Sequence, residues 1–251
     1  MNPVLAILLG NTTAALSLVR SRTPGRVRRV PVAHLERLRP YLAAARHGRV
    51  SPLIIVGSVN PPALERLRKL LDDMAYARPL VAREDFSIPI ETSVDRPERV
   101  GVDRLLGAVA ARERARGACI VVDCGTAITV NSVNARGVFL GGAIFPGLSM
   151  MAEALAEGTA QLPHVVPAGR VPVIGRSTEG AMIAGVLSGA AGAVTNLIAQ
   201  ARKVVGDRAH VFLSGGDAKR LAGLLPRDCC DIAANLVLEG LILAYRGWHK
   251  Q

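Results

Sequence analysis

Aromatic residues are scarce in this chain of 251 residues, where Phe, Tyr and Trp together make up 3% of the composition. Surfaces that bind nucleic acid commonly stack bases on aromatic rings set among basic side chains. The net charge of +11 comes mainly from arginine, and with so few rings it favours a solvated basic surface that attracts anionic ligands. The composition therefore disfavours a nucleic-acid partner.

The sequence also lacks a Cys-x-x-Cys pair and a long uninterrupted apolar run. Its cysteines, Cys119, Cys124, Cys229 and Cys230, lie in or beside apolar stretches, which indicates buried, reduced thiols rather than a zinc site. No run reaches the expected length of a membrane span, and the first residues lead into a short strand rather than a signal-peptide core. We expect a soluble cytoplasmic protein without a membrane partner.

The most informative pattern is a motif that occurs twice. Gly10-Asn11-Thr12 follows an apolar run near the N-terminus, and Asp123-Cys124-Gly125-Thr126 follows another run halfway along the chain. Each predicts a strand, a tight turn and a second strand. Glycine in such a turn lets backbone N–H groups and a hydroxyl approach a phosphate closely. Two similar turns predict a nucleotide held between two similar halves.

The elements after each turn follow the same order: further strands, then helices alternating with strands. This order predicts a duplicated α/β protein with an N-terminal half over residues 1–116 and a C-terminal half over residues 117–251. The second half is expected to include a long helix from about Ser177 to Val204 and a last helix from about Leu236 to Tyr245. The cleft between the halves is the expected place for the nucleotide.

Two candidate binding groups stand at predicted strand ends in the second half. The Asp123 carboxylate is able either to hold a cation beside phosphate or to accept hydrogen bonds from turn N–H groups, and the motif leaves both open. Gly215 and Gly216 follow a later strand, where the absence of side chains allows close approach by a ribose or a phosphate.

The run Gly101-Val102-Asp103-Arg104 opens a predicted helix. In the functional interpretation, Asp103 accepts a proton from an attacking hydroxyl and Arg104 binds a carboxylate. In the structural interpretation, Asp103 is a favourable charge at a helix N-terminus. Thr178 has a similar alternative as a helix-capping residue. The residues alone do not choose between these interpretations.

Taken together, these motifs resemble those of type III pantothenate kinases. The resemblance covers essentially the whole chain and is most specific from Val121 to Leu148, where residues 141–148 read Gly-Gly-Ala-Ile-Phe-Pro-Gly-Leu; Asn235 to Leu241 resembles the family's C-terminal signature. It implies the actin-like, sugar-kinase and Hsp70-type (ribonuclease H-like) fold. It also implies ATP-dependent phosphorylation of the 4′-hydroxyl of pantothenate, the first step of coenzyme A biosynthesis.

The resemblance implies a role for each motif. Asp103 would be the general base, and Asp123 would hold a monovalent cation, K⁺ or NH₄⁺. The pantothenate contacts would be Gly101, Val102, Asp103, Arg104 and Thr178. The ATP contacts, with Mg²⁺ accompanying the nucleotide, would be Gly10, Asn11, Thr12 and Thr126, and we add Gly215 and Gly216 as candidates. The family is dimeric, so a homodimer is expected.

Four positions depart from the family pattern. Leu8 replaces the first Asp, Ala15 a basic residue, Val94 an aromatic residue and Asn131 a second acid. Phosphoryl transfer depends on positioning and on charge stabilisation. Three readings therefore stay open: a working pantothenate kinase, a catalytically impaired relative that binds a ligand or regulates, and a kinase for another small alcohol.

Overall fold

The computed structural model describes residues 3–19, 23–46, 51–169, 174–227 and 229–249. The chain forms two compact units. Unit 1 comprises Met1–Glu91, Asp95–Glu113 and Asn235–Gln251, and unit 2 comprises Thr92–Val94 and Arg114–Ala234. The chain therefore passes into unit 2 close to the expected division at 116/117, but its C-terminal segment returns to unit 1.

Unit 1 is built on a five-stranded sheet in the order β3-β2-β1-β4-β5. Its strands are β1 (Val4–Leu9), β2 (Thr13–Val19), β3 (Arg28–Pro31), β4 (Leu53–Ser58) and β5 (Leu80–Val81). β1 pairs antiparallel with β2 and parallel with β4. Because parallel strands end at the same edge of a sheet, the loops that follow β1 and β4 lie side by side.

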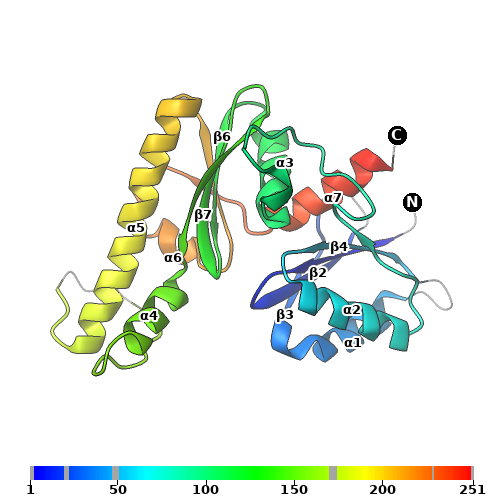
Figure 1. Ribbon diagram of the computed structural model, residues 1–251, viewed down its shortest axis with the longest axis horizontal. Coiled ribbons are helices and arrows are strands. Elements are labelled where there is room, and N and C mark those ends of the chain that lie inside the picture. Colours follow the sequence, from blue (N-terminus) through cyan, green and yellow to red (C-terminus); the bar gives the residue numbers. More distant parts are fainter. Residues whose placement is uncertain (1–2, 20–22, 47–50, 170–173, 228, 250–251) are drawn as a thin grey trace. The chain divides into compact units, whose positions relative to one another are not determined.

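Helices cover both faces of this sheet (Figure 1). One face is covered by the 3-10 helix η1 (Val32–Leu38), α1 (Arg39–Ala45) and α2 (Pro61–Asp73). The other face is covered by α3 (Val102–Ala115) and α7 (Leu236–Trp248). A short 3-10 helix, η2 (Pro97–Arg99), precedes α3. Along β1, Leu5 and Ile7 join the first core and Ala6 joins the second. A strand covered on both faces reads as a continuous apolar run, as β1 does.

The C-terminal helix α7 belongs to unit 1 because of a close contact with α3. Gly240 lies so near the backbone of Leu106 that a Cβ at position 240 would overlap the Leu106 carbonyl oxygen. Leu238 and Leu241 then pack into the core that contains Ala6 of β1. The sequence analysis placed this segment in the second half of the chain, whereas in the structure it belongs to unit 1.

Unit 2 repeats the topology of unit 1. Its strands are β6 (Cys119–Cys124), β7 (Ala127–Val133), β8 (Phe139–Pro146), β9 (His210–Ser214) and β10 (Asp231–Ile232), in the order β10-β9-β6-β7-β8. β6 pairs antiparallel with β7 and parallel with β9, as β1 does with β2 and β4. The predicted duplicated α/β architecture is confirmed.

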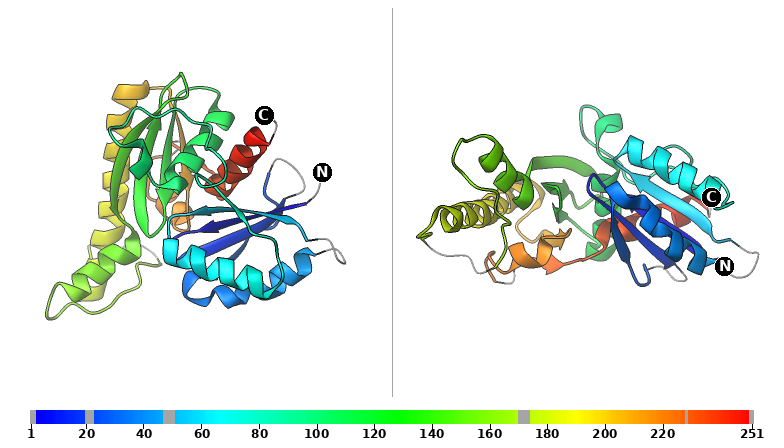
Figure 2. Two further views of the ribbon diagram at one scale, coloured as in Figure 1. Left: turned by 45° about the vertical axis from the view of Figure 1, so that its right-hand side comes forward. Right: turned by 90° about the horizontal axis from the view of Figure 1, so that it is seen from below.

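Three helices accompany the second sheet: α4 (Leu148–Glu157), α5 (Thr178–Val205) and α6 (Ala218–Ala222). In both views of Figure 2, α5 (yellow) runs along the second sheet, and its contacts are with β6 and β7. By length and composition α5 is able to cross a membrane, which the sequence-based reading overlooked. Its residues Met182, Val186 and Leu187 are buried, so this face of α5 is part of the core of unit 2.

Candidate functional site

The first candidate phosphate turn joins β1 to β2 in unit 1. The Gly10 N–H donates to the Thr13 carbonyl oxygen at 3.0 Å, and the Val32 N–H donates to the Thr12 carbonyl oxygen at 2.8 Å. Asn11 and Thr12 are exposed at the tip. The predicted strand, turn and strand are therefore present, and the three predicted ATP-contacting residues lie together.

Asn60 connects this turn to helix α2. Its side-chain Nδ2 donates to the Gly10 carbonyl oxygen at 3.4 Å, while its Oδ1 accepts the Ala63 N–H at 3.0 Å and so caps α2. The Val59 N–H donates to the Leu9 carbonyl oxygen at 3.0 Å, directly before the turn. One amide side chain therefore caps a helix and contacts the backbone of the candidate phosphate turn.

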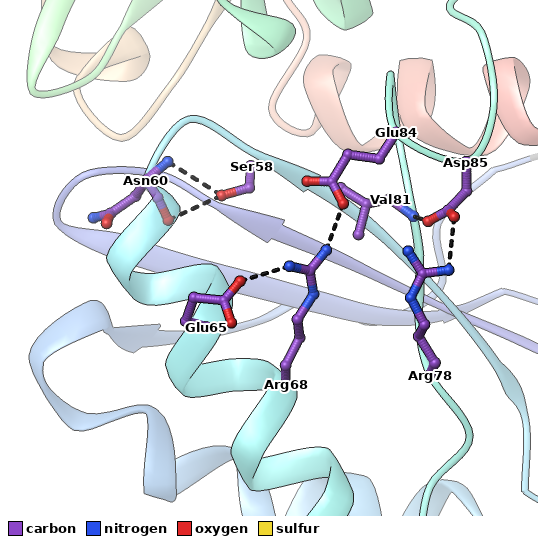
Figure 3. A network of polar contacts seen from close by, with 8 residues as sticks. All are labelled: Ser58, Asn60, Glu65, Arg68, Arg78, Val81, Glu84 and Asp85. Carbon is purple, nitrogen blue, oxygen red and sulfur yellow. Dashed lines mark hydrogen bonds and ion pairs between the residues drawn. The ribbon is translucent and has the colours of Figure 1, made fainter.

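The backbone of Asn60 is fixed as well. Its N–H donates to the Ser58 hydroxyl oxygen at 3.1 Å, as Figure 3 shows beside the ion pairs of Arg68 and Arg78 further along the surface. Sequence reasoning did not select Asn60. The available signal was an asparagine before Pro61 and Pro62, which is the arrangement of an N-cap followed by prolines in the first helical turn.

The candidate base lies in the first turn of α3. One Asp103 carboxylate oxygen, Oδ1, accepts the Arg104 N–H at 2.8 Å. Burial raises the pKa of Asp103 above its ordinary value, although the Arg104 N–H and charge oppose this rise. Burial lowers the pKa of Arg104, and the Asp103 charge opposes that change. A carboxyl group with a raised pKa is a stronger proton acceptor when ionised, as general-base catalysis requires.

Glycine at position 101 allows this arrangement. A Cβ at Gly101 would stand 2.5 Å from Oδ1 of Asp103, so any other residue would displace the carboxylate. The Arg104 N–H and the Leu105 N–H also point to the Gly101 carbonyl oxygen, at 3.1 and 3.3 Å. The predicted Gly-x-Asp-Arg motif is therefore a compact local structure at the start of α3.

Leu8 is one of three leucines that lie around Gly57 of β4. A Cβ built on Gly57 of β4 would lie 2.9 Å from Cδ2 of Leu8, 3.0 Å from Cδ1 of Leu106 and 3.7 Å from Cδ1 of Leu241. The three leucines thus converge over Gly57. Leu106 lies one helical turn after Asp103 and therefore shares its face of α3. The position where the family has an acid is packed against the core.

Ala15 is the second departure in unit 1, and it is the direct neighbour of the first. Leu8 of β1 and Ala15 of β2 are register partners in the antiparallel pair. Side chains of directly opposite residues lie on the same face of a sheet, close enough to form a pair. The positions at which the resemblance leads us to expect an acid and a basic residue are therefore register partners, and both side chains are apolar.

The second candidate phosphate turn, in unit 2, is supported by two glycines from elsewhere. The Gly147 N–H donates to the Thr126 carbonyl oxygen at 3.0 Å, and a Cβ at Gly147 would overlap the backbone of Gly125 and Thr126. Gly215 has a positive φ of 94° and lies against Cys124 in the same way. Both contacts require glycine, because the backbones meet without room for a side chain.

Asp123 and the Gly215–Gly216 pair lie at one edge of the second sheet. Asp123 is the register partner of Ser214 in the parallel pair of β6 and β9. The Asp217 N–H, just after the glycine pair, donates to the Cys124 carbonyl oxygen at 3.1 Å. The structure therefore brings Asp123, the Gly125 turn and the glycine pair together, as the sequence predicts for a nucleotide site.

The structure shows the local contacts of three further positions that the sequence analysis named in unit 2. Thr178 is exposed in the first turn of α5, and the helix cap is Ser177, whose hydroxyl accepts the Gly180 N–H at 3.0 Å. Asn131 is buried and donates from Nδ2 to the Thr129 hydroxyl at 2.9 Å. Val94 lies beside Gly141 of β8, on a segment that pairs with that strand.

Comparison with known proteins places the chain in a family. The model of type III pantothenate kinase matches residues 4–200. A type III pantothenate kinase of Rhodopirellula baltica is 40% identical over 227 residues, covering 84% of this chain and 80% of that protein. The chain belongs to the type III pantothenate kinase family. The family predicted from the motifs is confirmed.

Solved structures with little sequence similarity share the fold of this family member. Component A of the Acidaminococcus fermentans (R)-2-hydroxyglutaryl-CoA dehydratase has a TM-score of 0.56 at 16% identity, with 98% of this chain and 99% of that chain covered. A glucokinase from an Antarctic psychrotroph has a TM-score of 0.51 at 10% identity and the same coverage. The predicted actin-like, sugar-kinase fold is confirmed.

Replacing Asn60 tests whether it positions the turn or only caps α2. Serine is a good N-cap but does not reach the Gly10 carbonyl, whereas alanine does neither. If the turn receives phosphates, both Asn60→Ser and Asn60→Ala should weaken ATP binding by about five-fold, equivalent to roughly one hydrogen bond. Only Asn60→Ala should also lower the melting temperature. Titration calorimetry and thermal melting measure the two effects.

Tyr76→Phe is the matched control in the same unit. It removes the buried hydrogen bond from the Tyr76 hydroxyl to the Leu42 carbonyl oxygen, 2.6 Å long, and should lower the melting temperature without changing ATP affinity. If Asn60→Ser binds ATP as tightly as the wild type while Asn60→Ala binds ATP more weakly, Asn60 acts only as a helix cap and does not position the turn.

Proposed function

We propose that this protein transfers the γ-phosphate of ATP to the 4′-hydroxyl of pantothenate, with Asp103 as the general base. The observation that carries the proposal is the geometry around Asp103. Its carboxyl group is half-buried at the start of α3, its pKa is raised, and Gly101 leaves it the space it occupies. Membership in the type III pantothenate kinase family supplies the substrate.

In the proposed reaction, Asp103 accepts the proton of the 4′-hydroxyl while the oxygen of that hydroxyl bonds to the γ-phosphorus. The bond from that phosphorus to the bridging oxygen of ADP breaks, and ADP leaves. Arg104 is a half-buried guanidinium one residue away and is suited to bind the carboxylate of pantothenate. The hydroxyl of Thr178 is a second candidate contact for this substrate.

ATP is proposed to bind as its Mg²⁺ complex. The turns Gly10–Thr12 and Gly125–Thr126 occupy the same position in two sheets of identical topology, and each is proposed to contact phosphate groups of ATP. Gly215 and Gly216 are proposed to face the nucleotide. Leu8 offers no oxygen to Mg²⁺. Asp123 is proposed to hold a monovalent cation, K⁺ or NH₄⁺, because a carboxylate supplies oxygen ligands to a metal ion and accepts hydrogen bonds from ammonium.

We further propose a cytoplasmic homodimer, on the basis of the family and of cysteines that are free thiols in the described residues. A catalytically impaired, ligand-binding protein is the second candidate function. It is favoured by one observation: Leu8 and Ala15 are paired apolar residues, and Leu8 is packed against the core. Activity measurements separate the two.

Asp103→Asn tests the proposed base. Asparagine keeps an oxygen that accepts the Arg104 N–H but takes up no proton, so pantothenate-dependent release of ADP should fall about 100-fold or more in turnover number. Because the folded-state pKa of Asp103 is raised, its ionisation destabilises the fold as pH rises through that pKa. Asp103→Asn should therefore melt higher than the wild type near pH 7, and the difference should vanish below about pH 4.

Asp73→Asn is the control, because Asp73 is an exposed carboxylate of unit 1 paired with Arg39 at 3.1 Å. Its turnover should match the wild type. An active wild type with an equally active Asp103→Asn variant would remove Asp103 from the mechanism. A wild type that binds ATP but shows no pantothenate-dependent ADP release would favour the ligand-binding function.

Restoring the family's charge pair tests how the apolar residues Leu8 and Ala15 affect the stability of the fold and the rate of phosphate transfer. Leu8→Asp alone places an unpaired carboxylate among Leu106 and Leu241 and should destabilise the fold by several kcal/mol, on the order of 2–4. Adding Ala15→Lys provides a cross-strand partner. The double variant should regain part of the lost melting temperature and raise kcat/KM for ATP about ten-fold over the wild type, or about 1.4 kcal/mol.

Thermal melting and steady-state kinetics of both single variants and the double variant form a complete cycle. Ala15→Lys alone is the control and should leave the melting temperature nearly unchanged, because Ala15 is only half-buried. A folded double variant without any gain over the wild type would contradict the view that the apolar pair limits the handling of phosphate.

A further inference from the structure

A cavity of about 220 Å³ opens at the start of β9 in unit 2. Its lining includes Arg202, Arg208, His210, Cys229 and Cys230. β9 begins at this cavity and ends at the glycine pair that follows Ser214. A five-residue strand rises about 3.3 Å per residue, so the cavity is separated from the candidate nucleotide site by roughly the length of that strand.

Cys229 and Cys230 are two neighbouring thiols on the wall of this cavity. Their Sγ atoms are 3.6 Å apart, with the Cys229 thiol donating to Cys230. Both are free and half-buried, whereas Cys119 and Cys124 are fully buried. The expectation of buried thiols is therefore correct for Cys119 and Cys124 and wrong for the adjacent pair.

The two thiols are suited to act together rather than singly. Burial, followed by the hydrogen bond from Cys229, raises the pKa of Cys230 to about 12. Cys230 is therefore protonated at neutral pH and is a weak nucleophile by itself, since the thiolate is the reactive form. A ligand that bonds to both sulfurs binds more tightly than one that bonds to a single sulfur, because the second bond forms within one molecule.

The spacing of the sulfurs favours a bridging atom over a disulfide. Cα atoms joined by a trans peptide are about 3.8 Å apart, shorter than the roughly 4.4–6.8 Å usual for disulfides. A disulfide between neighbouring residues is therefore strained. By contrast, two sulfurs bonded at about 2.3 Å each to one pyramidal trivalent centre, at an angle of about 100°, lie roughly 3.5 Å apart, close to the observed 3.6 Å.

A trivalent centre that brings its own third substituent fits this pair better than a metal ion. Within the described parts of the chain, no group of three or more His, Cys, Asp or Glu side chains is placed to hold a metal. His210, another residue that lines the cavity, is paired with Asp231 at 2.8 Å. Arsenic(III) carrying an organic group needs only the two sulfurs to complete its bonding.

We propose that Cys229 and Cys230 form a capture site for trivalent organoarsenicals of the type R–As=O. In the reaction, two S–H bonds and the arsenic–oxygen bonds break, two As–S bonds form, and the oxygen leaves with both protons as water. Arsenic stays trivalent, so no oxidant or reductant takes part. The substituent R extends into the cavity, whose lining includes Ala209 and Val211 beside charged side chains.

The test uses the reduced full-length protein and phenylarsine oxide, with intact-mass spectrometry as the readout. One equivalent of reagent should add per chain, with a mass gain equal to the reagent minus water. An equimolar dithiol such as 2,3-dimercaptopropanol should remove the adduct, whereas the same concentration of 2-mercaptoethanol should leave most of it. This difference distinguishes a two-sulfur adduct from a single thiol bond.

Cys229→Ser and Cys230→Ser should each lower adduct formation at one equivalent at least ten-fold. Cys119→Ala, which removes a fully buried thiol of β6, is the matched control and should bind like the wild type. Thermal melting of each variant confirms that it is folded. No adduct on the folded wild type, or an undiminished adduct on both serine variants, would overturn the proposal.

Discussion

Close backbone contact at the ends of the central strands is the constraint on which the candidate site depends. In unit 2, Gly147 and Gly215 lie against the Gly125 turn and Cys124 with no room for a Cβ. In unit 1, Gly101 leaves space for the Asp103 carboxylate. The two contacts in unit 2 fix a backbone that is able to approach a ligand closely. The chemistry proposed for this family member depends on these fixed positions rather than on long flexible side chains.

The two units have the same topology but different surroundings at the corresponding turns. In unit 2, Asp123 lies beside Ser214, the last residue of β9. In unit 1, Leu8 lies beside Ala15 and packs toward Leu106. Phosphoryl transfer depends chiefly on positioned charge, and neither Leu8 nor Ala15 supplies a charge at the first turn.

Most of the fold and the centre of each motif were predictable from sequence, because they depend on local patterns. Apolar runs ending in Gly-Asn-Thr and Gly-Thr turns identified β1 and β6, and the long helix expected from about Ser177 to Val204 is α5. The rest depends on partners distant in sequence. Asn60 bonds to Gly10 across 50 residues, and α7 packs against α3 through Gly240. No local sequence pattern predicts such contacts. A two-residue strand such as β10 has too few residues to show a pattern of alternating apolar residues.

The central claim is that this protein, despite the apolar pair in its first turn, transfers phosphate to an alcohol rather than to water. Phosphorus-31 NMR of the protein with ATP, Mg²⁺, K⁺ and pantothenate tests this most directly, because ADP release alone does not distinguish transfer from hydrolysis. The account predicts a new phosphomonoester signal, equal in amount to the ADP formed and coupled to the 4′-methylene protons. Inorganic phosphate as the only new product, or unchanged ATP in a protein that binds it, would contradict the account.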